Sequence, residues 1–183
     1  ALMYEKPDHL NPGPPLAQLG EVYLFEGRID ESRSLLEKAL DVLDEKDVVF
    51  LAMAKTDLAE AALIQGDFEA AKYWLKEAYP HAVLHARRFI VFLCALAGYL
   101  VLPNGDKEDK QKAARLFGAI EKLSNQTGIG FNSYYQDLNK KRIALARKKL
   151  SEREWLEAFE SGYGWERGEA IQLAGTLLKR KHR

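Results

Sequence analysis

The sequence contains a single cysteine, no excess of charge of either sign and few residues that break helices. One thiol, Cys94, cannot form a disulfide within the chain, which fits a reducing compartment. The 27 basic and 27 acidic residues cancel, whereas a nucleic-acid-binding domain usually carries a basic excess. Only 6 prolines and 13 glycines punctuate the 183 residues, and the stretches between them are rich in Ala, Leu, Glu and Lys. These are strong helix formers, so the composition favours a helical, cytoplasmic protein.

Long hydrophobic runs are also missing. The longest apolar stretch, residues 89–102, is shorter than the roughly 20 residues of a transmembrane helix, and it predicts a buried helix instead. The first residues lack the charged-then-apolar pattern of a secretion signal, so no membrane partner is expected. Short basic runs occur at 140–142, 147–149 and 179–183, and we interpret them as solvated helix faces and a frayed end. No direct contact with nucleic acid is therefore expected.

Apolar residues recur with helical spacing and nowhere alternate as in a strand, which predicts an all-α chain of seven or eight helices. Residues 1–15 are rich in Pro and Gly and are expected to form a linker or N-terminal extension. A single helical-repeat domain is expected over residues 16–183. Within it the spacing predicts helix pairs at 16–44, 48–79 and 82–125, and further C-terminal helices at about 132–180.

Individual residues are expected to mark the helix ends. The side chains of Asp30 and Ser151 can accept hydrogen bonds from free backbone N–H groups at a helix start, so both are predicted to be N-caps. Pro80 is expected to break or kink the chain, because proline lacks the backbone donor and its ring clashes with the preceding turn. Residues 103–106, Pro-Asn-Gly-Asp, have the composition of a turn.

The first two predicted pairs share one pattern, shifted by 39 residues. Residues 19–27 read L-G-x-x-Y-x-x-x-G, and residues 58–66 read L-A-x-x-A-x-x-x-G. Further positions match at the same shift: Ser32 with Ala71, Leu36 with Leu75, and Ala39 with Ala78. The pattern resembles the tetratricopeptide repeat, in which W-x-x-L-G-x-x-Y is followed by A-x-x-x-F, although that repeat is usually about 34 residues long.

The resemblance implies antiparallel helix pairs stacked as a right-handed superhelix. Small residues such as Gly20 would let two helices approach closely, and large ones such as Leu19 and Leu58 would fill the space between them. A third, less regular pair contains Leu96-Ala97 and needs an insertion at about 103–110. The alternative is an array of α-hairpins without true tetratricopeptide geometry.

The C-terminal third carries a more specific resemblance. Its segment A-A-R-L-F-G-A-I-E is similar to one near the C-terminal end of the helical-repeat region in bacterial signal-transduction ATPases and LuxR-type transcriptional regulators. In those proteins the segment is followed by a loop, a long charged helix, a motif similar to W-x-E-G and a final A-x-x-L-A motif. The corresponding residues here are 113–121, then 127–130, 134–149, 157–162 and 169–174. The resemblance implies the tetratricopeptide-like C-terminal arm of such a regulator, with a role in signal transduction and transcription regulation.

Catalytic chemistry is not expected in this chain. It has no G-x-x-x-x-G-K-[ST] loop and no basic helix-turn-helix, so ATP hydrolysis and DNA contact would lie elsewhere in the parent protein. His81 and His85 share a helix face but lack the glutamate of a zinc protease, and Cys94 lies in an apolar stretch typical of a core. Carboxylate pairs such as Glu152 and Glu154 fit a solvated helix face. We therefore expect no catalytic residue, no metal and no cofactor.

The remaining candidate site is the concave groove, which the first helix of each pair lines in tetratricopeptide arrays. The repeat alignment places a mostly apolar set with two acids there: Ala17, Glu21, Leu24, Met53, Thr56, Glu60, Leu63, Val91, Cys94, Gly98 and Val101. This set lacks the Lys, Arg and Asn donors that hold a peptide's terminal carboxylate. The predicted partner is therefore a larger protein surface. Alternatively, these residues pack against later helices or against the rest of a parent protein.

These observations predict an interaction module rather than an enzyme. We expect a regulatory arm that contacts other domains of its own chain, a partner protein or an effector ligand, and whose binding shifts the parent between conformations. Two alternatives stay open. One is a stand-alone scaffold that forms homo-oligomers through its apolar faces. The other is a small-molecule effector sensor that uses a cavity between the repeats and the C-terminal helices.

Overall fold

The computed structural model describes residues 11–102 and 106–179, and this part of the chain forms nine α-helices and no strand. The all-α prediction is confirmed. The expected number of helices, seven or eight, is close to the nine of the described residues. The helices are α1 Gly13–Phe25, α2 Ile29–Leu40, α3 Val48–Gln65, α4 Phe68–Ala82, α5 Ala86–Val101, α6 Lys107–Thr127, α7 Ser133–Arg147, α8 Glu152–Tyr163 and α9 Arg167–Lys179.

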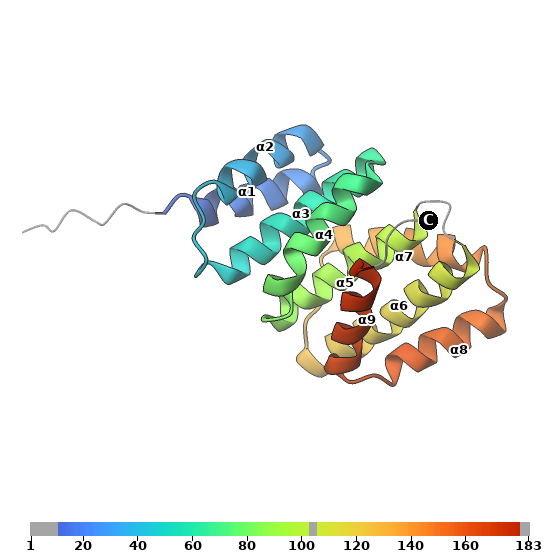
Figure 1. Cartoon of the computed structure of the whole chain (residues 1–183). Coiled ribbons are helices and arrows are strands. Elements are labelled where there is room, and N and C mark those ends of the chain that lie inside the picture. The colour runs from blue at the N-terminus through green and yellow to red at the C-terminus, as the bar shows by residue number, and fades with distance from the viewer. Residues whose placement is uncertain (1–10, 103–105, 180–183) are drawn as a thin grey trace, which may run out of the picture.

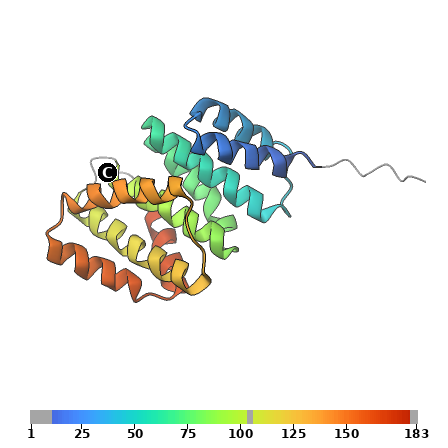
Figure 2. The same cartoon turned by 180° about the vertical axis from the view of Figure 1, so that it is seen from behind.

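The first six helices stack as three antiparallel pairs, α1 with α2, α3 with α4, and α5 with α6 (Figure 1). Helix α8 packs along α6 at the far end of this stack. The two other C-terminal helices lie on opposite faces. Helix α9 packs against α4 and α6, on the side that faces the viewer in Figure 1. Helix α7 packs against α5 and α6 on the other side, which the reverse view shows in front (Figure 2).

The turns within the first two pairs confirm the repeat. Helix α1 is followed by Gly27 and helix α3 by Gly66, and both glycines have positive φ angles, of 77° and 75°. This left-handed conformation is strained for residues with a Cβ atom, so glycine is favoured at both positions. The two glycines are 39 positions apart, which is the shift of the sequence pattern.

Two predictions about helix starts have opposite outcomes. Ser151 caps α8, since its hydroxyl accepts from the Glu154 N–H and the Glu154 carboxylate accepts from the Ser151 N–H. The prediction for Asp30 is wrong, because α2 begins one residue earlier and the Asp30 carboxylate instead accepts from the Gln65 side chain at 2.9 Å. The cap that the sequence analysis missed is Asp67, whose carboxylate accepts from the backbone N–H of Ala70 at the start of α4.

Proline positions also differ from the predictions. Helix α1 begins at Gly13 rather than residue 16, because prolines in the first turn of a helix lose no hydrogen bond. Helix α4 continues through Pro80 and ends at Ala82, so the proline loses its own backbone hydrogen bond without ending the helix at its position. The break follows at residues 83–85, and α5 begins at Ala86 rather than residue 82. The expected linker at residues 1–10, most of the turn at 103–106 and the tail at 180–183 lie outside the described residues.

Buried apolar side chains form two clusters. The smaller lies between the first two pairs and contains Ala17, Leu36, Ala39, Met53, Ala54 and Leu58. The larger joins α3 to α6 with the C-terminal helices. Leu19 was expected to fill the space between helices, yet it is exposed on the outer side of α1. Leu19 therefore occupies the repeat position that the sequence predicts, but its side chain is 42% exposed to solvent.

Candidate functional site

The residues predicted to line the concave groove are mostly buried. Leu24, Met53, Thr56, Glu60, Leu63, Val91 and Cys94 are buried, and only Glu21 of the predicted set keeps partial exposure. Met53 lies in the cluster between the first two pairs, and Leu63 belongs to the larger cluster. The groove is therefore not open as expected, because α7 lies in it. The alternative interpretation, packing against a later helix, describes the arrangement.

Helix α7 contacts the first helix of every pair. Its aromatic start meets α1, where the ring of Phe25 lies 4.8 Å from that of Tyr134 and 5.6 Å from that of Tyr135. The Tyr135 hydroxyl donates to Asp57 of α3 at 3.2 Å. One turn later the Asn139 side chain donates to the sulfur of Cys94 on α5 at 3.3 Å. The helix thus crosses the three helices that a tetratricopeptide groove offers.

A buried ion pair fixes the second half of α7. The guanidinium of Arg142 pairs with the carboxylate of Glu60 and donates to the backbone carbonyl of Cys94 at 3.2 Å. Both side chains of the pair are 1% exposed. Gly98 provides the space, since a Cβ atom there would collide with the guanidinium. Residues Tyr135, Asn139 and Arg142 recur at the i, i+4, i+7 spacing of one helix face, which is why a single side of α7 supplies all these contacts.

The groove also contains the carboxyl group of Asp57, whose pKa is changed by burial. Burial raises the pKa of the Asp57 carboxyl well above its ordinary value, and the nearby Glu21 carboxylate raises it further. Arg88 of α5 pairs with Glu21 at 3.1 Å and lowers the pKa of Asp57 in part. Within the described residues, Asp57 Oδ2, Glu60 Oε2 and Asn139 Oδ1 have no protein hydrogen-bond partner. The contact between α7 and the groove is consequently polar and incompletely paired.

Cavities beside α7 are of two kinds. A small, partly open one of about 40 Å³ lies between Glu21, Phe25, Arg88 and the loop at 129–132. This is room for water, whereas pockets for drug-sized ligands occupy about 300–1,000 Å³. The other, of about 520 Å³, is a solvent-open hollow on the outer side of α7, next to Tyr134. Neither is the enclosed effector cavity that one alternative required.

The surroundings of Cys94 and His81 do not favour catalysis or metal binding. Burial raises the pKa of the Cys94 thiol to about 12, and a protonated thiol is a poor nucleophile. His81 contacts the Lys55 ammonium at 3.1 Å, and burial and this cation lower the pKa of its imidazole. Across residues 11–102 and 106–179, no group of His, Cys, Asp or Glu is arranged to hold a metal ion. No helix in the same ranges is both long and apolar enough to cross a membrane.

Comparison with known proteins adds one match. Residues 13–82 match the tetratricopeptide repeat family. The matched region begins with α1 and ends with α4, so it covers the two helix pairs whose sequences repeat. No curated protein and no solved structure matches the chain. Tetratricopeptide repeats generally mediate protein–protein interaction and are typically non-catalytic, which agrees with the class of function that the sequence predicts.

The most informative groove residue was missed. Arg142 belongs to the basic run 140–142, which was expected to be a solvated helix face. That interpretation holds for Lys140 and Lys141 but is wrong for Arg142, which turns into the tetratricopeptide groove. One signal was present in the sequence. Tyr135, Asn139 and Arg142 have the spacing of one helix face, and this face carries fewer charges than the rest of the helix. The difference between the two faces could have indicated that this face packs against other helices.

Proposed function

We propose that this chain is a protein-interaction module, the helical-repeat arm of a multidomain bacterial transcriptional regulator or signalling ATPase. The observation that carries the proposal is the tetratricopeptide match over residues 13–82, because such repeats generally mediate protein–protein interaction. The tetratricopeptide groove here accommodates a helical protein segment through an acid on its floor and an arginine on the segment.

The order of elements after the second pair supports the regulatory part of the proposal. Helix α6 is followed by the loop at 128–132, the basic helix α7, and the short helices α8 and α9. The resembling regulators have the same order of segments at the end of their repeat region. The effector-sensor alternative has less support, because the partly open cavity of about 40 Å³ is far smaller than a metabolite pocket.

The native polypeptide tests this proposal. An antibody raised against the chain should detect, in cells that carry its gene, a protein much larger than 20.8 kDa. Peptide mass spectrometry of the purified protein should find a nucleotide-binding loop within it. A native product of only this length would overturn the regulatory-arm assignment, and hydrolysis of ATP by the 183-residue chain alone would contradict the non-catalytic role.

A further inference from the structure

Equivalent positions in the three helix pairs differ sharply in exposure. On the outer side of α1, Leu19 is 42% and Val22 is 45% exposed. The equivalent residues of α3, 39 positions later, are Leu58 at 1% and Ala61 at 0%. In α5 the same places are taken by Leu96 at 1% and Tyr99 at 8%. The first pair thus presents to solvent the face that the next two pairs bury.

The burial of this face follows one rule. Leu58 lies in the same cluster as Leu36 and Ala39, which the second helix of the preceding pair supplies. Leu96 likewise shares a cluster with Leu75 and Ala78, the repeat equivalents of those two residues. In each case the first helix of a pair packs against a surface of leucine and small side chains on the second helix of the preceding pair. Only α1 has no such neighbour among the described residues.

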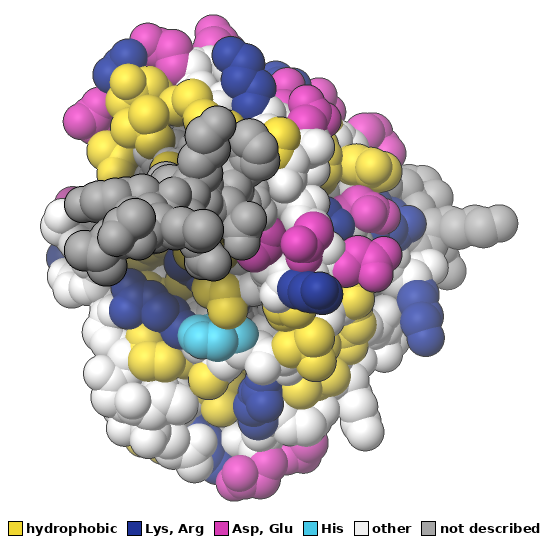
Figure 3. Space-filling view, turned by 90° about the vertical axis from the view of Figure 1, so that its left-hand side faces the viewer, with side chains coloured by type: hydrophobic (Ala, Val, Ile, Leu, Met, Phe, Trp, Pro, Cys, Tyr) yellow, Lys and Arg dark blue, Asp and Glu magenta, His cyan; other side chains and the backbone are white. Residues whose placement is uncertain are grey.

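The two ends of the stack are finished differently. Helix α8 covers α6 and turns a mostly charged side outward, with only Leu156 and Tyr163 as large exposed apolar residues. Its exposed charged residues are Glu152, Arg153, Glu157 and Glu160. Repeat arrays need such a polar outer face on their terminal units. The α1–α2 end instead exposes Leu19 and Val22 of α1 and Val42 just after α2. Figure 3 shows hydrophobic side chains at the upper left and again lower on this side of the molecule, with charged side chains between them.

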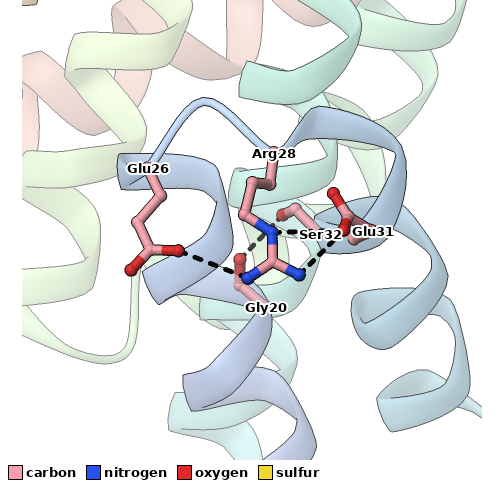
Figure 4. A network of polar contacts seen from close by, with 5 residues as sticks. All are labelled: Gly20, Glu26, Arg28, Glu31 and Ser32. Atoms are coloured by element: carbon pink, nitrogen blue, oxygen red, sulfur yellow. Dashed lines mark hydrogen bonds and ion pairs between the residues drawn. The ribbon is translucent and has the colours of Figure 1, made fainter.

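The exposed face is held in place without a partner. The Ser32 hydroxyl donates to the carbonyl of Gly20 at 2.7 Å and ties α2 to α1 (Figure 4). Arg28 at the turn pairs with Glu31 at 2.8 Å and with Glu26 at 3.5 Å. A surface already ordered in this way loses little conformational entropy when another element docks on it.

A second copy of this chain does not offer a free surface of the kind that covers α3 and α5. Repeat stacking is head-to-tail, so the face of Leu19 requires the opposite kind of face from its neighbour. In every copy that opposite face is already used, because Leu36 and Ala39 are buried against α3 and the far end is covered by α8. An occupant that follows the stacking of the described pairs therefore brings a helix pair of its own.

We propose that the outer face of α1 and α2 docks a further tetratricopeptide-type helix pair, supplied by the same polypeptide ahead of α1. This inference rests on the proposed function, since it needs a longer parent protein. The second helix of the docking pair presents a small residue, a leucine or phenylalanine four positions later and a small residue three positions after that. This is the spacing of Ser32, Leu36 and Ala39.

Cysteine labelling tests the inference, because Cys94 is buried and is the chain's only thiol. Val22→Cys is introduced into the native parent polypeptide and into the 183-residue chain, and maleimide modification is followed at that position by peptide mass spectrometry. Modification should be slower by about tenfold or more in the parent, because a docked helix pair must open before the thiol reacts. Glu157→Cys on the polar side of α8 is the matched control and should react equally in both proteins.

Each other outcome overturns the inference in a recognisable way. Equal reactivity of Val22→Cys in both proteins would show an uncovered face, and the regulatory-arm proposal would still stand on the length and domains of the parent. Protection in the isolated chain that rises with concentration would assign the face to a second copy. Protection that disappears when residues 1–10 are deleted would assign it to that segment. A native product of only this length would overturn the inference and the proposed function together.

Discussion

Arg142 is a buried cation whose charge is compensated by the carboxylate of Glu60. Removing one member of a buried ion pair leaves the other uncompensated and typically costs about 3–5 kcal/mol. We therefore expect Arg142→Met to lower the free energy of unfolding by about this amount in urea denaturation, because Glu60 would remain buried without a cation. The exposed neighbour Lys141→Met is the control and should change stability by no more than about 0.5 kcal/mol.

The paired variant separates charge from packing. Replacing both Glu60 and Arg142 by methionine removes the uncompensated charge and keeps most of the buried volume. The double variant should be clearly more stable than Arg142→Met alone. If the double variant is as unstable as the single one, the ion pair is not the contact that holds α7.

Asp57 makes stability depend on pH with an unusual sign. Its folded-state pKa is raised above the ordinary value of 3.8 by burial and by Glu21, so the folded chain binds more protons than the unfolded chain above about pH 4. The contribution of Asp57 to the free energy of unfolding consequently falls as the pH rises through this window. Asp57→Asn keeps the acceptor for Tyr135 and removes the charge.

The measurement is the difference in unfolding free energy between Asp57→Asn and the unmodified chain. This difference should grow in favour of the variant as the pH is raised from about 4 toward neutrality. Subtracting the two curves removes the contributions of groups that titrate in the same way in both proteins. A difference independent of pH would contradict the raised pKa of Asp57.

At the scale of elements, two glycines decide how α6 and α8 meet. A Cβ atom at Gly162 would collide with the backbone carbonyl of Arg115, and one at Gly118 would collide with that of Phe159. Backbone cannot move aside as a flexible side chain can. We expect Gly162→Ala to destabilise the protein by about 1–3 kcal/mol or more, the range for overpacked contacts, measured by thermal or urea unfolding.

Gly168 is a matched control for this substitution. It lies in the first turn of α9, and a Cβ atom there would meet nothing within 4 Å. Gly168→Ala should leave stability unchanged or raise it by up to about 1 kcal/mol, because alanine favours helix more than glycine does. Equal effects of the two substitutions would mean that the close approach of α6 and α8 is not maintained in solution.

Helices and their repeat were predictable because they depend on local chemistry. The period of small and large residues placed the first two pairs, and Ser151 with Glu154 carried a capping box that acts within one turn. Pro80 and Asp30 were misjudged, since their effect depends on where a helix boundary falls by one or two residues. Sequence spacing alone does not set that boundary.

The groove was predictable only in part. Repeat alignment identified Glu60 and Cys94 as residues on the inner side, and both do face an inner contact. The alignment could not show that α7, which follows 73 residues after Glu60, returns to cover them. This contact is non-local and polar, so neither hydrophobic periodicity nor the repeat pattern encodes it. Arg142 was accordingly taken for a surface residue.

At the scale of the whole molecule, Cys94 reports on the docking of α7. The thiol contacts Asn139 of α7 and is fully buried, so a labelling reagent reaches it only after an opening event. Because α7 buries only Tyr135, Asn139, Arg142 and Ala146, we expect it to open at a lower free energy than the helix-pair stack.

The prediction is that Cys94 reacts with a thiol reagent in urea concentrations where circular dichroism still shows the folded helices. Arg142→Met should accelerate this native-state labelling by about tenfold for each 1.4 kcal/mol that α7 docking loses. Gly168→Ala should leave the rate unchanged. Labelling that tracks global unfolding at every urea concentration would show that α7 and the stack form one cooperative unit.

The difference between the charged outer side of α8 and the apolar outer side of α1 gives the array a direction of growth. A duplicated helix pair inserted ahead of α1 meets a face that already fits it, whereas one added after α8 would meet glutamates and an arginine. We therefore expect an added helix pair to be accommodated ahead of α1 rather than after α8. In an alignment of homologous sequences, we expect the block from α5 to α9 to keep a constant length while the number of helix pairs ahead of it varies.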